Sequence, residues 1–153
     1  MKLSKNFSLA EFCKSQTATR LGLDNTPTQE HIDNAVLLAV NVLQPVRENF
    51  GPTVINSGYR GAALNKAVGG SSKSQHCKGQ AADIECIGHS NYDVAVWIRD
   101  NLEFDQLILE GYKSGDPRSG WVHVSFNKEG NRKKVMTADF STGKAVYSMG
   151  LNK

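Results

Sequence analysis

The sequence predicts an α+β domain, built from a mostly antiparallel sheet with flanking helices. Helical spacing of apolar residues dominates the first third of the chain, whereas the rest holds short apolar stretches with strand-like alternation. Only one longer amphipathic segment, residues 92–102, interrupts these stretches. Helices that precede a run of strands are typical of α+β proteins. We therefore expect one sheet packed against the helices.

Length and composition fit a single domain over residues 1–153. The chain is 39% hydrophobic and 22% charged, which suffices for a real core but not for a second independent domain. The most apolar stretch is interrupted by Asn41, Gln44 and Pro45, so we expect no membrane insertion. The N-terminal stretch is charged too early to be a secretory signal peptide, and we expect synthesis in the cytoplasm.

The net charge indicates which binding partners to expect, and the cysteine count indicates whether disulfides form. The net charge is +3 and the basic residues are dispersed, so a mild preference for anionic partners is expected without the dense basic face of nucleic-acid binders. We expect no nucleic-acid partner and a monomer. Cys13, Cys77 and Cys86 are an odd number without a CxxC pair, which favours free thiols over a disulfide framework.

The predicted helices at the start are marked by their caps. Ser8 and Glu11 form a capping box before a short helix. A longer helix follows, with Thr26 as its cap, Pro27 in its first turn and Gln29 completing a second box. We expect it to reach about residue 50, with a bend at Pro45.

Short strands and helices should alternate from there. Residues 54–56 read as a strand and 62–67 as one or two helical turns. A polar loop leads into a turn and a strand over residues 79–86, and Asn91 is a plausible cap for the helix over 92–102.

The last third of the chain predicts two hairpins. Residues 107–110 and 121–126 are apolar-rich strands separated by a glycine-rich loop, which is the layout of a hairpin with a long tip. Residues 139–147 predict a final hairpin.

Three side chains of these segments suit a metal. His76 and Asp83 flank a glycine turn, and alternation places Asp83 on the same strand face as the small Ala81. In the strand over 121–126, His123 shares a face with Trp121, opposite the core-facing valines. Two histidines and a carboxylate are a common ligand set for catalytic Zn²⁺, with a fourth position open for water. A lone histidine, however, is more often a surface or hydrogen-bonded core residue.

The motifs strengthen the metal interpretation. The pattern Ser-x-His-x-x-Gly-x-Ala-x-Asp over residues 74–83, followed by Val-His-Val-Ser, resembles the zinc D-Ala-D-Ala peptidase family, peptidase M15, with its DD-peptidase/Hedgehog-like fold. This family includes D,D-carboxypeptidases, dipeptidases and phage L-alanyl-D-glutamate endolysins. The resemblance implies zinc held by His76, Asp83 and His123. It extends to three further segments: residues 43–47, 57–60 and 104–108.

The same resemblance suggests roles for other residues. It places Arg60 in the catalytic cleft, where the guanidinium would orient the substrate, although a surface arginine after a turn is the alternative. Ser74 either contacts the substrate or merely closes a turn. Independently of the resemblance, Trp121 shares the strand face of His123, where it either forms a cleft wall or packs as an ordinary aromatic residue.

The catalytic base is the uncertain assignment. Some relatives carry an Asp or Glu three residues before the last histidine, where this chain has Gly120. Glu110 ends a strand that would pair with the His123 strand, so we expect it beside the metal as general base. Asp116, in the hairpin tip, is the second candidate.

The predicted function is zinc-dependent hydrolysis of peptidoglycan stem peptides, by a D,D-carboxypeptidase or an L-alanyl-D-glutamate-type endopeptidase. The resemblance further suggests phage-type host lysis, with the enzyme held in the host cytoplasm until its release to the cell wall. The alternative is a non-catalytic, zinc-bearing module that binds the wall or belongs to a virion. The missing carboxylate at Gly120 keeps this alternative open.

Overall fold

The computed structural model of the chain describes residues 1–152 and confirms the α+β class. Helices dominate the first third of the chain, and a six-stranded sheet is built from the rest. The helices are α1 (Leu9–Cys13), α2 (Gln16–Leu21), α3 (Gln29–Leu38), α4 (Gln44–Phe50), α5 (Ala62–Ala67) and α6 (Asn91–Asn101). A π-helical segment, η1 (Ala39–Leu43), joins α3 to α4, and a 3-10 turn, η2 (Gln75–Lys78), precedes β4.

The sheet runs in the order β3-β4-β6-β5-β7-β8. Its strands are β3 (Thr53–Ser57), β4 (Ala81–Cys86), β5 (Gln106–Glu110), β6 (Trp121–Ser125), β7 (Lys134–Asp139) and β8 (Val146–Met149). All neighbours are antiparallel except β5 and β7, which are parallel. A small antiparallel pair, β1 (Lys2–Ser4) and β2 (Phe7–Ser8), stands apart at the N-terminus.

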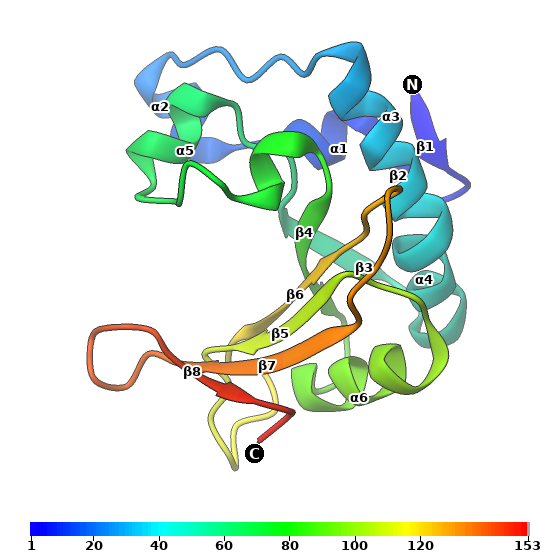
Figure 1. Cartoon of the computed structure of the whole chain (residues 1–153), viewed down its shortest axis with the longest axis vertical. Coiled ribbons are helices and arrows are strands. Elements are labelled where there is room, and N and C mark those ends of the chain that lie inside the picture. The colour runs from blue at the N-terminus through cyan, green and yellow to red at the C-terminus, as the bar shows by residue number, and fades with distance from the viewer. Residues whose placement is uncertain (153) are drawn as a thin grey trace.

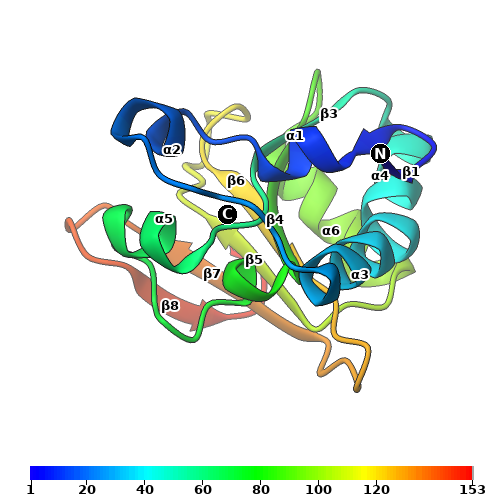
Figure 2. The ribbon, with the colours of Figure 1, turned by 90° about the horizontal axis from the view of Figure 1, so that it is seen from above.

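The two faces of the sheet differ in chemistry. Helices α4 and α6 lie along one side of the sheet, as Figure 1 shows, and this side is the apolar core. In the other direction lie α5, which Figure 2 shows to the left of β4, and the turn η2, which contacts β4. Val122 and Val124 are fully buried in the core, whereas His123 points the opposite way, as the alternation predicted. The sheet thus presents its polar side chains on the face away from α4 and α6.

The long helix differs from the prediction at its start. Thr28, not Thr26, is the N-cap: its hydroxyl accepts a hydrogen bond from the His31 N–H, and the His31 ring reaches back to the Thr28 N–H. Just before Pro45, where the sequence predicted a bend, the helix contains the π-helical segment, at whose end the Gln44 N–H bonds to the Ala39 carbonyl. Because proline has no N–H, the regular hydrogen-bond pattern cannot pass through this position.

The cap of α6 also differs. Ser90, not Asn91, is the N-cap, since its hydroxyl accepts from the Asp93 N–H at 3.0 Å. Asn91 is buried, and its Nδ2 donates to the carbonyls of Ser119 and Gly120 at 2.9 and 3.0 Å. Asn91 therefore holds the end of the β5–β6 loop by hydrogen bonds, directly before β6, the strand that contains His123.

Three elements were not predicted from the sequence: the strands β1 and β2 and the helix α2. The other elements lie close to their predicted positions, with the last hairpin starting earlier, at Lys134. None of the helices within residues 1–152 has the length and apolar character needed to cross a bilayer.

Candidate metal centre and catalytic cleft

Two histidines and one aspartate converge on the polar face of the sheet. His76 lies on the 3-10 turn η2, Asp83 on β4, and His123 on β6 directly opposite Asp83 in the strand register. Asp83 Oδ1 lies 3.3 Å from His76 Nε2 and 3.0 Å from His123 Nδ1. The three donor atoms all lie within 4.8 Å of one another. The structure thus brings together the three side chains that the sequence predicted as ligands, in an arrangement that could hold a metal ion.

The His76 ring is oriented by its second nitrogen. Nδ1 lies 2.7 Å from the carbonyl oxygen of Gly58, which can only accept a hydrogen bond, so Nδ1 carries a proton and Nε2 faces Asp83 Oδ1 at 3.3 Å. Such a backbone partner is typical of metal-binding histidines. A metal ion bound between Nε2 and Asp83 Oδ1 would take the place of the hydrogen bond that joins them.

The spacing of the donor atoms fits zinc. Ligand atoms about 2.0–2.1 Å from a tetrahedral Zn²⁺ lie about 3.3 Å apart. The two separations from Asp83 Oδ1, 3.3 and 3.0 Å, are close to this value. His76, Asp83 and His123 would therefore hold the metal, which leaves a fourth position toward the cleft.

Electrostatics couple the members of the triad. Burial raises the pKa of the Asp83 carboxyl, but hydrogen bonds from His123 and His76 outweigh burial and hold this pKa well below its usual range. Burial lowers the pKa of His123, yet its hydrogen bond to Asp83 and the charge of that carboxylate raise the pKa overall. Asp83 is therefore an anion in this site, ready to bind a cation.

Close backbone packing sets the position of the His76 turn. A Cβ on Gly58 would lie 2.2 Å from the Phe12 carbonyl oxygen, so only glycine fits between β3 and α1. On the other side, the Arg60 N–H donates to the His76 carbonyl at 3.1 Å. The Ser-Gly-Tyr-Arg segment thus holds His76 through its backbone. Sequence reasoning singled out only the Arg60 side chain, although the glycine in the motif was the available signal.

A cavity of about 580 Å³ opens above the triad. Its walls come from β4, β5, β6, the loop after α5 and the C-terminal hairpin β7–β8. The predicted substrate residues Arg60, Ser74 and Trp121 all line it. Ser74 also closes the turn, as its hydroxyl accepts from the His76 N–H at 3.2 Å. The two roles weighed for Ser74 are therefore compatible.

Glu110 lies in the same cavity, and Trp121 holds its side chain. The two residues are opposite one another in the β5–β6 register, and Trp121 Nε1 donates a hydrogen bond to Glu110 Oε2. Burial raises the pKa of the Glu110 carboxyl, while the charge of His123 lowers it. A half-buried carboxylate with a raised pKa, in the same cavity as the metal triad, has the character of a general acid–base group.

Gly120 explains why the base cannot occupy the position used by some relatives. Its φ is +71°, and a Cβ there would lie 2.1 Å from the Glu110 carbonyl oxygen and 2.7 Å from the Tyr112 nitrogen. A side chain at residue 120 would collide with this backbone. The second candidate, Asp116, is exposed in the hairpin tip, where its backbone bridges to Lys113, and it does not line the cavity.

The sequence did not reveal one wall of the cleft. Phe140 and Tyr147, from the C-terminal hairpin, line the cavity, and the Phe140 ring stacks on Trp121 with centroids 5.8 Å apart and planes at 19°. Nothing in the local sequence places this hairpin against β6. The parallel pairing of β7 with β5 does so.

Comparison with known proteins agrees with this geometry. A protein-family model described as Peptidase M15 matches residues 5–125. The matched region contains the whole triad, Arg60 and Glu110, and it ends before the C-terminal hairpin. No curated protein matches the chain. Because the match spans most of the chain and includes a convergent His-Asp-His site, the chain belongs to the zinc-dependent metallopeptidases of the peptidase M15 family.

Proposed function

We propose that the protein hydrolyses peptide bonds in the stem peptides of bacterial peptidoglycan, as a D,D-carboxypeptidase or an L-alanyl-D-glutamate-type endopeptidase. The observation that carries this proposal is one cavity that contains both the metal triad and a half-buried carboxylate, Glu110. A non-catalytic metal site would not need the second carboxylate.

Each residue of the cleft has a distinct task in this reaction. Zinc, when bound, supplies a Lewis acid that polarises the scissile carbonyl and lowers the pKa of water. Glu110 takes a proton from the attacking water as the new C–O bond forms, and passes it to the leaving amine as the C–N bond breaks. The raised pKa of Glu110 suits both steps, because the group must accept and then release a proton near neutral pH.

Arg60 orients the substrate in the proposed mechanism. Its Nε is buried and makes no hydrogen bond to any residue within 1–152. Burial of an unpaired guanidinium N–H is unfavourable, so a substrate carbonyl or carboxylate that accepts this hydrogen bond would bind tightly. Trp121 and Phe140 form an aromatic wall against which an apolar part of the peptide packs.

A role in phage-type host lysis, with the protein held in the host cytoplasm until release, remains part of this proposal. It rests on the resemblance to lytic members of the family. The competing function is a zinc-bearing module that binds the wall or a virion without cleaving it. Gly120 favours this alternative, because the carboxylate found there in some relatives is missing.

Digestion of purified peptidoglycan separates the two functions. Zinc-loaded wild type should release new peptide termini, which mass spectrometry assigns to one bond. Glu110→Gln should bind zinc normally and cleave at least about 100-fold more slowly, as expected when a general base is lost. Glu103→Gln, an exposed glutamate just before β5, is the matched control and should cleave like wild type. Zinc-loaded wild type that binds the wall but releases no termini would establish the binding module instead.

A further inference from the structure

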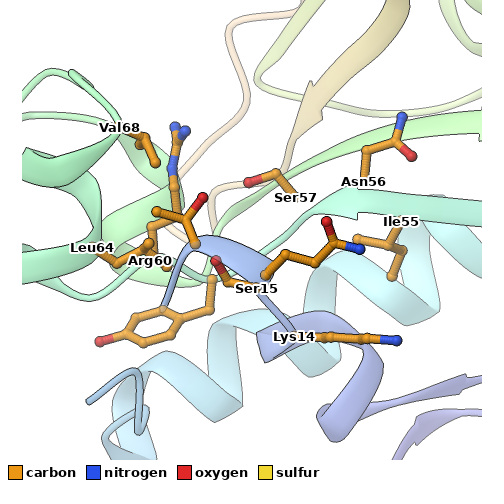
Figure 3. A pocket seen from close by; sticks show the side chains of 11 residues that line it. Lys14, Ser15, Ile55, Asn56, Ser57, Arg60, Leu64 and Val68 are labelled. Carbon is orange, nitrogen blue, oxygen red and sulfur yellow. The ribbon is translucent and has the colours of Figure 1, made fainter. Parts of the chain in front are cut away.

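A second cavity, of about 570 Å³, adjoins the metal cleft and has no part in the mechanism above. It lies along β3, between the α1–α2 connection and α5, and Figure 3 shows the side chains that line it. We call it the β3 groove. Arg60 and Val68 line both cavities, so the groove begins where the metal cleft ends.

The charge of the groove is one-sided. Lys14 and Arg60 are its only charged lining residues, and no carboxylate belongs to the lining. Figure 3 shows Arg60 beside Leu64 and Val68 at one side, and Lys14 near Ile55 at the other, with Ser57 between them. Asn56 Nδ2 donates a hydrogen bond of 2.7 Å to Glu85, which lies outside the lining. A ligand of the groove is therefore expected to be anionic.

The backbone of the groove suits an extended peptide. β3 is the edge strand of the sheet and pairs only with β4 among the described strands, while its residues 55–57 line the groove. An edge strand offers N–H and C=O groups to a peptide that lies alongside it. Ser15, Gln16 and Thr17 line the groove from the α1–α2 side and add further hydrogen-bonding groups.

The β3–β4 strand register places the groove beside the metal site. Ser57, in the groove, lies opposite the metal ligand Asp83 in the β3–β4 register. Arg60, whose backbone N–H is bonded to the His76 carbonyl, has a buried Nε without a partner. A peptide that passes Arg60 could thus occupy the groove with one part and the metal cleft with another.

From these observations we propose that the β3 groove is a second substrate subsite, which binds an extended, carboxylate-bearing part of the peptide beyond the scissile bond. This inference rests on the proposed peptidase function and specifies its substrate. It implies that the protein prefers long, anionic stem peptides over dipeptides, because a dipeptide fills only the metal cleft.

Kinetics on a pair of peptides that have the same sequence but differ in charge test the subsite. The pair is a synthetic stem peptide with free carboxylates and the same peptide with the carboxylates distant from the cleaved bond amidated. In wild type, amidation should raise KM about three- to fivefold with kcat unchanged, the size expected for one exposed charge pair. Lys14→Gln should abolish this difference, whereas Lys66→Gln, an exposed lysine of α5 outside both cavities, should preserve it.

A steric variant and a binding measurement complete the test. Gln16→Trp, at an exposed lining position, should weaken binding of the long peptide and leave a dipeptide unaffected. In NMR titrations of zinc-loaded Glu110→Gln, the free-carboxylate peptide should shift the amide signals of residues 55–57 more than the amidated peptide does. Equal KM values for the two peptides in wild type, with shifts confined to the metal cleft, would overturn the subsite.

The titration also separates this inference from the proposed function. If wild type cleaves no wall peptide, the peptidase function fails. The groove is still decided by binding: carboxylate-dependent shifts at residues 55–57 support it, and their absence refutes it.

Discussion

Trp121 Nε1 donates a hydrogen bond to Glu110 Oε2 across the β5–β6 pair, in the cavity that contains the metal ligands. This bond lowers the pKa of Glu110, which burial raises. Trp121→Phe keeps an aromatic ring but removes the donor, so the Glu110 pKa should rise further. Because the base acts in its deprotonated form, activity should then be lost at a higher pH on the acidic side of the kcat/KM profile. At neutral pH kcat should fall about tenfold, the cost of a hydrogen bond to a charged group.

Trp97→Phe is the matched control for this prediction. Trp97 lies on α6 and packs against Phe50, away from the cleft. Its replacement should leave the pH profile unchanged. An identical profile for Trp121→Phe and wild type would contradict the role assigned to the indole.

The metal site should bind one zinc ion per chain. Elemental analysis should find that His76→Ala, Asp83→Ala and His123→Ala each lose the metal, because removing one of three protein ligands leaves an incomplete site. His89→Ala, an exposed histidine outside the cleft, should retain it.

Chelation of the zinc should lower the melting temperature as well as abolish activity. At a zinc concentration 1,000 times Kd, binding to the folded state alone adds about 4 kcal/mol of stability. Differential scanning calorimetry with and without chelator measures the shift. Full zinc retention by the His123 variant would place the metal elsewhere. Unchanged melting of wild type on chelation would show that zinc does not stabilise the folded state.

Replacement of Gly120 by any residue with a side chain should lower both stability and activity. Gly120→Ala introduces a Cβ 2.1 Å from the Glu110 carbonyl oxygen at a φ of +71°. It should both destabilise the fold and displace Glu110, so that the free energy of unfolding and kcat fall together. Gly115→Ala provides the comparison, since Gly115 has a similar φ of +88° but no atom within 4 Å of the added Cβ. It should cost only the backbone strain, about 1 kcal/mol, with kcat retained. Equal effects of the two variants on kcat would refute the steric argument.

Protonation of Asp105 at acid pH should lower the free energy of unfolding. Hydrogen bonds from the Arg132 side chain outweigh burial and lower its pKa, and Gln75, next to His76, also donates to it at 2.9 Å. Its stabilising contribution is therefore complete above the unfolded-state pKa of about 3.9 and is lost as pH falls through the lower folded-state pKa. Asp105→Asn should lose about 2 kcal/mol at neutral pH and show a shallower decline of stability below about pH 4.

Urea unfolding from pH 7 to pH 3 measures the Asp105 effect. Asp33→Asn, an exposed aspartate of α3, should follow wild type throughout. An Asp105→Asn curve that runs parallel to wild type over this range would contradict the linkage.

Phe140 should influence substrate binding from outside the family-matched region. Its ring stacks on Trp121 in the cleft. Phe140→Ala should raise KM several-fold, since such aromatic pairs contribute about 1 kcal/mol. Met149→Ala, at a 69% exposed position on β8, should leave KM unchanged. An unaltered KM for Phe140→Ala would show that Phe140 does not contribute to substrate binding.

The sequence by itself determined the α+β class, most of the elements and the three side chains that converge as candidate metal ligands. These features depend on local signals: period-two alternation fixed the faces of Asp83 and His123, and Ser8 with Glu11 formed the capping box that the spacing predicted. Local signals failed at the start of the long helix, where the sequence predicted Thr26 as the cap but Thr28 caps the helix, because the entry angle of the chain decides which hydroxyl reaches the first turn.

Tertiary structure alone decided how the cleft is completed. Whether Glu110 or Asp116 lies near the metal depends on the β5–β6 register and on the close approach of Gly120, which no local pattern encodes. The aromatic wall at Phe140 depends on the parallel pairing of β7 with β5, between segments distant along the chain. The ligand set could thus be read from residue spacing, whereas the surrounding cavity required long-range strand pairing that only the folded chain establishes.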